Sequence, residues 1–369
     1  MTDELQRETE IAGTPPVPAR GRLWAWLERV DPGTHRRIKG LRLVTAFGLA
    51  AMAGRMPDVV DSLDAGPSLS VLAGGFALWA SVSEARNTRP DSSRDLLALC
   101  TAAALGAASF ALLAPLLGRV SASAPELVLV TGAFCTGYLR RFGVLGTGIG
   151  SQIYIGQLLA YGAGLGSGDL WTVAVAGLIA SIAAIVPRVL SGPAERPALA
   201  PTVGPVRAAG LTGLRPELAM GLQAATAALL IIWLAWMFSL QEPAWAITAC
   251  TYVIAGTAAG TVDRVRRRIL GTMVGVPLGL ACLPLALHAP LLLWLAAALA
   301  MVIYAMALPE RYDIACGAFA FTLVVTLAAS GEHSVTLLVA RAWETVLGGT
   351  IGLLSALLLL PLRPEKPAG

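Results

Sequence analysis

The chain has 369 residues, of which 56% are hydrophobic and only 14% are charged, and its mean hydropathy is +0.70. This leaves too little polar surface for a water-soluble protein of this size, so the composition excludes a soluble globule. The net charge of +4 does not indicate nucleic-acid binding, because the Arg and Lys residues are distributed between apolar segments. We expect the lipid bilayer as the main partner and no nucleic acid.

Residues 1–41 are predicted to form a cytoplasmic N-terminal tail. The segment is polar and lacks an apolar core followed by a small-residue cleavage site, so no cleavable signal peptide is expected. Within it, residues 22–40 place Trp24, Trp26 and Leu27 among several Arg and Lys residues. This pattern is typical of an amphipathic helix that lies on the membrane interface.

Apolar stretches long enough to cross the hydrocarbon recur along the rest of the chain. We predict an all-α polytopic membrane protein with about twelve transmembrane helices, arranged as two parallel six-helix repeats. The Pro-rich segment 191–216 is expected to be an extended cytoplasmic linker between repeats 42–190 and 217–362, and 363–369 a cytoplasmic tail. The predicted spans are 42–60, 68–84, 95–117, 124–139, 142–164, 169–190, 217–239, 244–261, 269–288, 289–308, 312–330 and 335–361.

The orientation follows from the charges in the loops. With the N-terminus in the cytoplasm, the opposite loops contain only Arg119, so the positive-inside rule predicts that both termini face the cytoplasm from the inner membrane. The positively charged residues assigned to cytoplasmic loops are Arg86, Arg89, Arg94, Arg140, Arg141, Arg188, Arg196, Arg207, Arg215, Arg264, Arg266, Arg267, Arg268, Arg363 and Lys366.

A comparison of the chain with itself at offsets of 173 and 174 residues indicates an internal duplication. Six spans per repeat is an even number, so both halves enter the bilayer in the same direction, and a substrate route is expected between them. A homodimer of the whole chain is compatible with this arrangement. The matches include Arg42 with Arg215, Gly48 with Gly221, Arg94 with Arg268, and Pro187 with Pro361.

No motif in the sequence indicates an enzyme, a metal site or a cofactor. The five cysteines are isolated within apolar segments, and the sequence contains no HExxH, GxSxG or phosphate-binding GxxxxGK[ST] pattern. Asp91 and Asp95 form a DxxxD pair that could hold Mg2+, but Arg89 and Arg94 surround it and no second acidic motif supports it. A lipid-modifying enzyme is therefore a weak alternative.

Ionisable residues within the spans are candidates for a substrate pathway. Arg341 and Glu344 lie one helical turn apart in the last span, where an isolated charge costs at least ~2.5 kcal/mol. They either form an ion pair that fixes this helix or bind a substrate carboxylate or a coupled proton. Arg268 and its repeat partner Arg94 are either orientation anchors or anion-recognition residues at the cytoplasmic mouth.

Polar and aromatic residues in apolar spans form a second group of candidates. Each needs either a partner in the helix bundle or a wet pathway, and both interpretations are open. This group consists of Gln152, Tyr154, Gln223, Trp245, Thr248 and Tyr252. The small-residue patterns GTMVG (Gly271 and Gly275) and GGTIG (Gly348, Gly349 and Gly352) are interpreted as helix-packing sites.

The stretch RRILGTMVG (residues 267–275), preceded by PAWAIT (243–248), resembles the fusaric acid resistance protein-like family of aromatic acid exporters, and RAWETVLG (341–348) resembles its closing motif. The first half looks like a degenerate copy that keeps Arg94. The resemblance implies export of aromatic or other organic acids. A distant similarity to plant malate channels implies an anion pathway at a twofold interface.

One feature departs from larger members of the family. They carry a soluble cytoplasmic domain between the two halves, for which the linker of this chain is too short. The alternative from another class is a non-transporting membrane scaffold, in which all polar residues within the spans would pair in a dry core.

Overall fold

The computed structural model describes residues 31, 34–63, 68–86, 88–121, 124–191, 208–210, 215–240, 242–308, 310–329 and 335–364. The side chains of 61–63, 208–210, 286–287, 329, 335–338, 341 and 363–364 lie outside this description. Most of the predicted interfacial helix at 22–40, part of the linker and the last five residues are also outside it. Statements about partners below concern the described residues.

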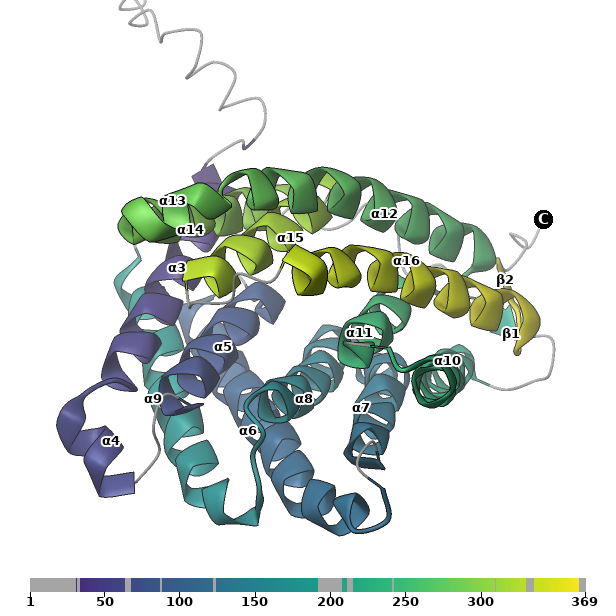
Figure 1. Ribbon diagram of the computed structural model, residues 1–369, viewed down its shortest axis with the longest axis horizontal. Helices are drawn as coiled ribbons and strands as arrows, with labels where there is room; N and C mark the ends of the chain where they lie inside the picture. Colours follow the sequence, from purple (N-terminus) through teal and green to yellow (C-terminus); the bar gives the residue numbers. More distant parts are fainter. Residues whose placement is uncertain are drawn as a thin grey trace, which may run out of the picture.

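Among the described residues, seven α-helices belong to the first half and seven to the second (Figure 1). Those of the first half are α3 (His35–Ala53), α4 (Pro57–Leu63), α5 (Ser68–Ser83), α6 (Arg89–Gly118), α7 (Leu127–Tyr138), α8 (Gly143–Gly162) and α9 (Leu170–Leu190). Those of the second half are α10 (Pro216–Phe238), α11 (Pro243–Val253), α12 (Ala258–Ala281), α13 (Leu283–His288), α14 (Pro290–Ala307), α15 (Tyr312–Ala329) and α16 (Val335–Leu358). The short 3-10 helices are η2 (Ala124–Glu126), η3 (Leu139–Phe142) and η4 (Ser167–Asp169).

The prediction of a helical membrane protein is confirmed. In the described chain, five helical segments are long and apolar enough to cross a bilayer, and 68–83, 312–328 and 342–358 are apolar but shorter. The twelve-span count stays a prediction. The five segments are Arg89–Gly118, Ser167–Leu190, Pro216–Phe238, Ala258–Leu285 and Pro290–Ala307.

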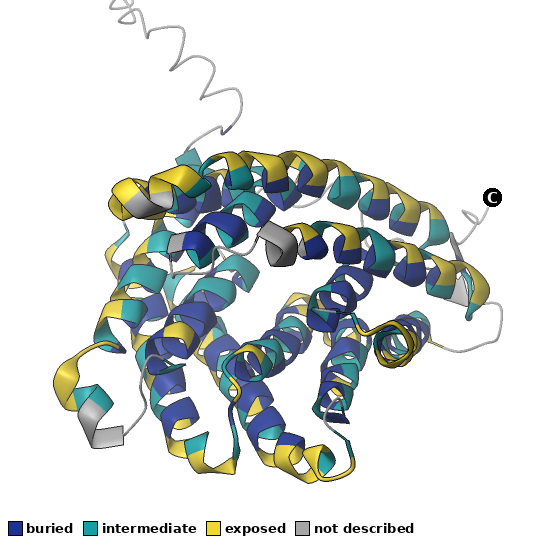
Figure 2. Cartoon of the chain, in the orientation of Figure 1, coloured by how far each residue is buried: buried dark blue, intermediate teal, exposed yellow. Residues whose placement is uncertain are grey.

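The exposed faces of the helices are apolar, as contact with lipid requires. Figure 2 shows that α12 is exposed along its outer side and buried along the side toward the bundle. The exposed side consists largely of Leu270, Met273, Val274 and Leu278, each more than half exposed. A soluble protein rarely exposes so continuous an apolar face, so this face of α12 is suited to contact with lipid.

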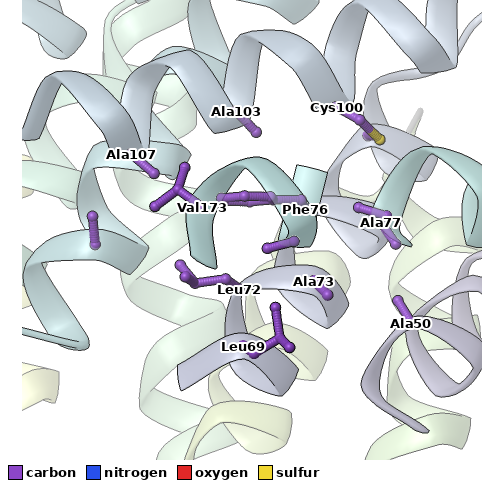
Figure 3. Packing of buried hydrophobic residues seen from close by; sticks show 14 of the residues in the cluster. Ala50, Leu69, Leu72, Ala73, Phe76, Ala77, Cys100, Ala103, Ala107 and Val173 are labelled. Atoms are coloured by element: carbon purple, nitrogen blue, oxygen red, sulfur yellow. The ribbon is translucent and has the colours of Figure 1, made fainter. Parts of the chain in front are cut away.

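The core of the first half is built from one aromatic ring and many small side chains. Figure 3 shows Phe76 of α5 among Ala103 and Ala107 of α6 and Val173 of α9, all of them buried. Small residues let the helix backbones approach closely, which is the usual basis of helix packing in lipid. Cys100 also lies in this core, and all five cysteines are free, in keeping with their interpretation as packing residues.

The packing partners follow the same order in the two halves. In the first, α3 packs on α5 and α9, α6 on α8 and α9, and α7 on α8. In the second, α10 packs on α11 and α16, α12 on α15 and α16, and α14 on α15. The contacts that join the halves include α14 against α3 and α10 against α7, and α11 also touches α7.

Several predicted spans have different boundaries in the structure: the span predicted at 269–288 is α12 (Ala258–Ala281) followed by α13, and two others show a physical reason. The span expected at 244–261 ends at Val253, and α12 begins at Ala258, because the Thr257 hydroxyl accepts a hydrogen bond from the Gly260 N–H and caps the new helix. The span expected at 42–60 begins at His35 instead, since the Asp31 carboxylate accepts from the N–H groups of Arg36 and Arg37 in the first turn.

The linker and the C-terminal tail meet in a short antiparallel ladder that the sequence does not predict. Strand β1 (Ala208–Gly210) pairs with β2 (Leu362–Pro364), with Ala209 opposite Arg363. Gln223 strengthens the same corner, because its side-chain Nε2 donates to the carbonyls of Leu359 and Leu360 at the end of α16. The end of α16 is thereby held against α10.

Glycines set the closest helix contacts in both halves. A Cβ on Gly156 of α8 would fall 2.0 Å from the Ala103 carbonyl oxygen of α6, and one on Gly275 of α12 would fall 2.2 Å from the Gly317 carbonyl oxygen of α15. The GTMVG pattern therefore lies at a tight α12–α15 contact. Gly348 makes a similar approach to Ala246 of α11.

We predict that Gly275→Ala lowers the free energy of unfolding by about 1–3 kcal/mol, because the methyl group forces α12 and α15 apart. The measurement is the thermal or denaturant unfolding of the purified protein in detergent. Gly48→Ala in α3 is the matched control: nothing lies within 4 Å of its Cβ, so the higher helix propensity of alanine should leave stability equal or slightly higher. Equal losses in both variants would contradict the packing role.

Candidate functional site

Several of the loops between helices lie at one end of the bundle, and these loops and the adjoining helix ends contain most of its arginines. Arg36 at the start of α3 donates to the carboxylate of Glu310 between α14 and α15, and Arg267 of α12 donates to the Glu310 carbonyl at 3.1 Å. The hydrogen bond from Arg36 holds the pKa of the Glu310 carboxyl below its usual value. Parts of the chain that the positive-inside rule assigns to one side therefore lie together.

Two arginines meet where this end lies between the halves. Arg140 of η3 and Arg264 of α12 both donate to the Ile254 carbonyl, at 3.5 and 3.4 Å, in the break between α11 and α12. Arg140 also donates to the Thr136 carbonyl at 3.2 Å. Two guanidinium groups on one carbonyl leave excess positive charge at this point, which attracts anions.

Arg268 lies one helical turn further along α12 than Arg264. Its Nη1 donates to the Tyr312 hydroxyl across a long 3.4 Å, while its Nε is buried and has no acceptor among the described residues. Tyr252 and Tyr304 lie within electrostatic range of the guanidinium. Arg268 as a whole is half-buried, but its buried Nε donor is suited to a carboxylate, because an unmet donor there costs free energy.

Hydroxyl groups connect the two halves beside Arg268. The Thr248 hydroxyl of α11 donates to the Ala244 carbonyl at 2.7 Å, so the Tyr154 hydroxyl of α8 donates to Thr248 at 2.8 Å. Tyr252 of α11 and Ser151 of α8 share a hydrogen bond of 2.7 Å. We call Arg268, Tyr154, Tyr252, Tyr304 and Tyr312 the arginine–tyrosine cluster.

An aromatic group borders the cluster. Trp79 of α5 packs edge-on against Tyr304 of α14, with ring centroids 6.2 Å apart, and against Phe319 of α15 at 5.5 Å. The Tyr154 and Tyr252 rings pack edge-on at 5.9 Å. These rings offer flat apolar surface next to a guanidinium, which suits an aromatic carboxylate.

The structure brings four predicted site residues together. Arg268, Tyr154, Thr248 and Tyr252 meet at the arginine–tyrosine cluster. Four residues that sequence reasoning missed also lie there: Trp79, Ser151, Tyr304 and Tyr312. Tyr304 could have been found by the criterion that selected Tyr252, a hydroxyl in an apolar span.

The predicted glutamines serve the bundle itself. Gln152 donates to the Ser83 hydroxyl at 3.0 Å, and Gln223 caps α16 as described above. Trp245 is half-buried in the first turn of α11, one turn before Thr248.

Arg94 and Arg268 lie at different depths of their helices. Arg94 is exposed six residues after the N-cap Thr88 of α6, whereas Arg268 lies eleven residues after the N-cap Thr257 of α12. At a rise of ~1.5 Å per residue, this difference is roughly 7 Å. The two arginines therefore do not form a symmetric pair at one mouth.

The acidic candidates have partners of their own. Glu344 is fully buried in α16, and its carboxylate accepts from the Glu242 N–H at 3.0 Å, at the positive N-terminal end of α11. Arg341 is in the same helix, and its side chain lies outside the described part. Asp91 accepts from the Thr88 hydroxyl at 2.7 Å, whereas Asp95 pairs with Arg86 at 2.9 Å, so the two aspartates are held by separate partners.

The second half of the chain matches a known protein family. Residues 229–355 match the model of the fusaric acid resistance protein-like family. The segment contains all of α11, α12, α14 and α15, and it includes Thr248, Tyr252, Arg268 and Glu344. No curated protein and no solved structure matches the chain. The family match and the apolar helices together indicate a membrane protein of transporter type.

We predict that the Tyr154–Thr248 hydrogen bond couples the two halves. Tyr154→Phe and Thr248→Val should each lower the free energy of unfolding, and the double variant should lose about 1 kcal/mol less than the sum of the two, because both remove one bond. The measurement is a double-mutant cycle of unfolding in detergent. Tyr138→Phe, at an exposed hydroxyl near the loop, is the control. Strict additivity would argue against the coupling.

Proposed function

We propose that this chain is an integral membrane exporter of aromatic or other organic acids, with a route between two six-helix repeats in the inner membrane. The observation that carries the proposal is Arg268, a half-buried arginine whose Nε donor is buried and unused among the described residues, and which lies among tyrosines. The substrate carboxylate accepts from Arg268 and Tyr312, and the aromatic part packs on the nearby rings. No cofactor is required.

The packing order supports the two repeats. The helices of the two halves can be paired in chain order, and this pairing turns the contacts of one half into those of the other. The pairs are α3 with α10, α5 with α11, α6 with α12, α7 with α14, α8 with α15, and α9 with α16. The contact between α3 and α14 then becomes that between α10 and α7. This exchange is what a pseudo-twofold axis along the membrane normal produces.

Glycines at the two joints support the same axis. Gly40 of α3 approaches Val302 of α14, and Gly221 of α10 approaches Phe134 of α7. Each glycine lies six residues after the N-cap of its helix, Thr34 for α3 and Arg215 for α10. Corresponding positions therefore close both joints between the repeats.

The distribution of charge supports export. Arg140 and Arg264 lie at the cytoplasmic end in the proposed orientation, and Arg268 lies deeper along the same helix. At the opposite end, Glu126, Glu242 and Glu344 lie within electrostatic range of Tyr161. An organic anion is thus attracted at the cytoplasmic side, and the opposite end offers acidic groups in place of arginines.

One observation favours a scaffold without transport as the second candidate. The hydroxyls of Tyr154, Thr248, Tyr252 and Ser151 satisfy one another across the halves, as they would in a dry seam. The lipid-modifying enzyme has less support, because Asp91 and Asp95 are bound to different partners.

We predict that Arg268→Gln slows efflux of benzoate and related carboxylates from proteoliposomes at least tenfold. A charge-assisted hydrogen bond contributes about 1.5–3 kcal/mol, and Gln removes it. Arg268→Lys should be intermediate, since Lys keeps the charge but not the planar donors. Arg266→Gln is the matched control, because it removes the same charge from an exposed position of the same helix.

The comparison with Arg266→Gln decides between transport and scaffold. If Arg268→Gln and Arg266→Gln transport a broad carboxylate panel at the rate of the wild type, Arg268 does not recognise substrate. If the wild type transports none of the panel, the scaffold interpretation is favoured.

A further inference from the structure

A pocket opens at the far end of α10, away from the arginine-rich end. Its volume is about 540 Å3, within the range of sites for small organic molecules. Ser121 and Glu126 line it from the connection between α6 and α7, and Trp236, Ser239 and Leu240 line it from the end of α10. We call it the outer pocket.

Glu126 gives the outer pocket its chemistry. The residue is only 8% exposed, and its Oε1 accepts from the Tyr161 hydroxyl at 3.2 Å. The other oxygen, Oε2, is buried and has no hydrogen-bond donor among the described residues, and the same holds for the Ser121 hydroxyl. Since burying a carboxylate without a partner is unfavourable, this oxygen is suited to a donor brought by a ligand.

The surroundings of Glu126 favour a positively charged ligand. In the described part of the chain, no Arg or Lys forms an ion pair with it. An ammonium group at Oε2 would supply both the missing donor and a counter-charge, whereas an organic anion would be repelled.

The remaining wall favours an organic cation over a metal ion. Trp236 is 57% exposed, and Leu240 and Pro243 are apolar. A Ca2+ or Mg2+ ion needs about six or more oxygen ligands, and no group of three metal-binding side chains occurs among the described residues. An indole face beside a carboxylate is instead a common setting for an ammonium group joined to an apolar body.

We propose that the outer pocket binds a small organic ammonium cation, with the ammonium on Glu126 and the apolar body against Trp236. The site is distinct from the arginine–tyrosine cluster, and its ligand has the opposite charge. It does not depend on the proposed export of organic acids.

The test is calorimetric titration of the full chain in nanodiscs with phenethylammonium chloride. The wild type should bind, and Glu126→Gln should bind at least tenfold more weakly, because Gln keeps the size and the acceptor for Tyr161 but loses the charge. Trp236→Leu should weaken binding about threefold. Glu217→Gln, in the first turn at the opposite end of α10, is the matched control and should bind like the wild type.

Neutral and anionic probes complete the experiment. Phenethyl alcohol should bind at least tenfold more weakly than phenethylammonium, and benzoate should not compete. Absence of binding to the folded wild type, undiminished binding by Glu126→Gln, or equal binding of the alcohol would each overturn the proposal. Arg268→Gln should bind the amine normally while its benzoate efflux is slowed, so the failure of one proposal is distinguishable from failure of the other.

Discussion

Polar side chains inside the bilayer cannot rely on water, and this constraint decides how the two halves are joined. Tyr154 and Ser151 of α8 find their partners in Thr248 and Tyr252 of α11, so hydroxyls of the first half are satisfied by hydroxyls of the second. Arg268 lies beside this join and is only weakly held by Tyr312. The position proposed to recognise an anion therefore lies beside the hydrogen bonds that join the halves.

Close backbone contact makes this exchange of hydrogen bonds geometrically possible. Gly137 of α7 and Gly221 of α10 let these two helices approach closely, and each packs on one helix of the α8–α11 pair that shares the hydrogen bonds. Within the second half, Gly275 brings α12 against α15 and so carries Arg268 toward Tyr312. Packing and site are consequently linked: a larger residue at these glycines would move the donors away from their acceptors.

The sequence predicts the elements well because their signals are local. Apolar stretches identify the helices, and hydroxyls in apolar spans identify Tyr154, Thr248 and Tyr252, which do meet. The break after Val253 also had a local signal in Thr257, a hydroxyl suited to cap α12, but the hydropathy of the surrounding residues obscured it. Gln223 was selected by the same criterion as Tyr252, yet its partners are carbonyls at the end of α16, far along the chain. Only tertiary structure distinguishes the two.

The predicted equivalence of Arg94 and Arg268 shows a second kind of limit. A single offset of 173–174 residues assumes equal loops in both halves, whereas the caps of α6 and α12, Thr88 and Thr257, imply 169, and those of α3 and α10, Thr34 and Arg215, imply 181. The helix α4 lengthens the connection after α3, so the register changes along the half. Sequence matching aligned two arginines that structure places at different depths.

That difference in depth has a consequence for how the halves work together. Counted from the caps, the position in α6 that corresponds to Arg268 is Leu99, which is buried in an apolar core. The two halves are therefore similar in packing, but at this counted position α12 carries a guanidinium and α6 an apolar side chain. At the other end, Glu126 of the first half and Glu344 of the second lie near the same tyrosine. The two halves thus resemble each other in packing and differ in charge, so under the proposed function an anion between them would meet an asymmetric electrostatic potential.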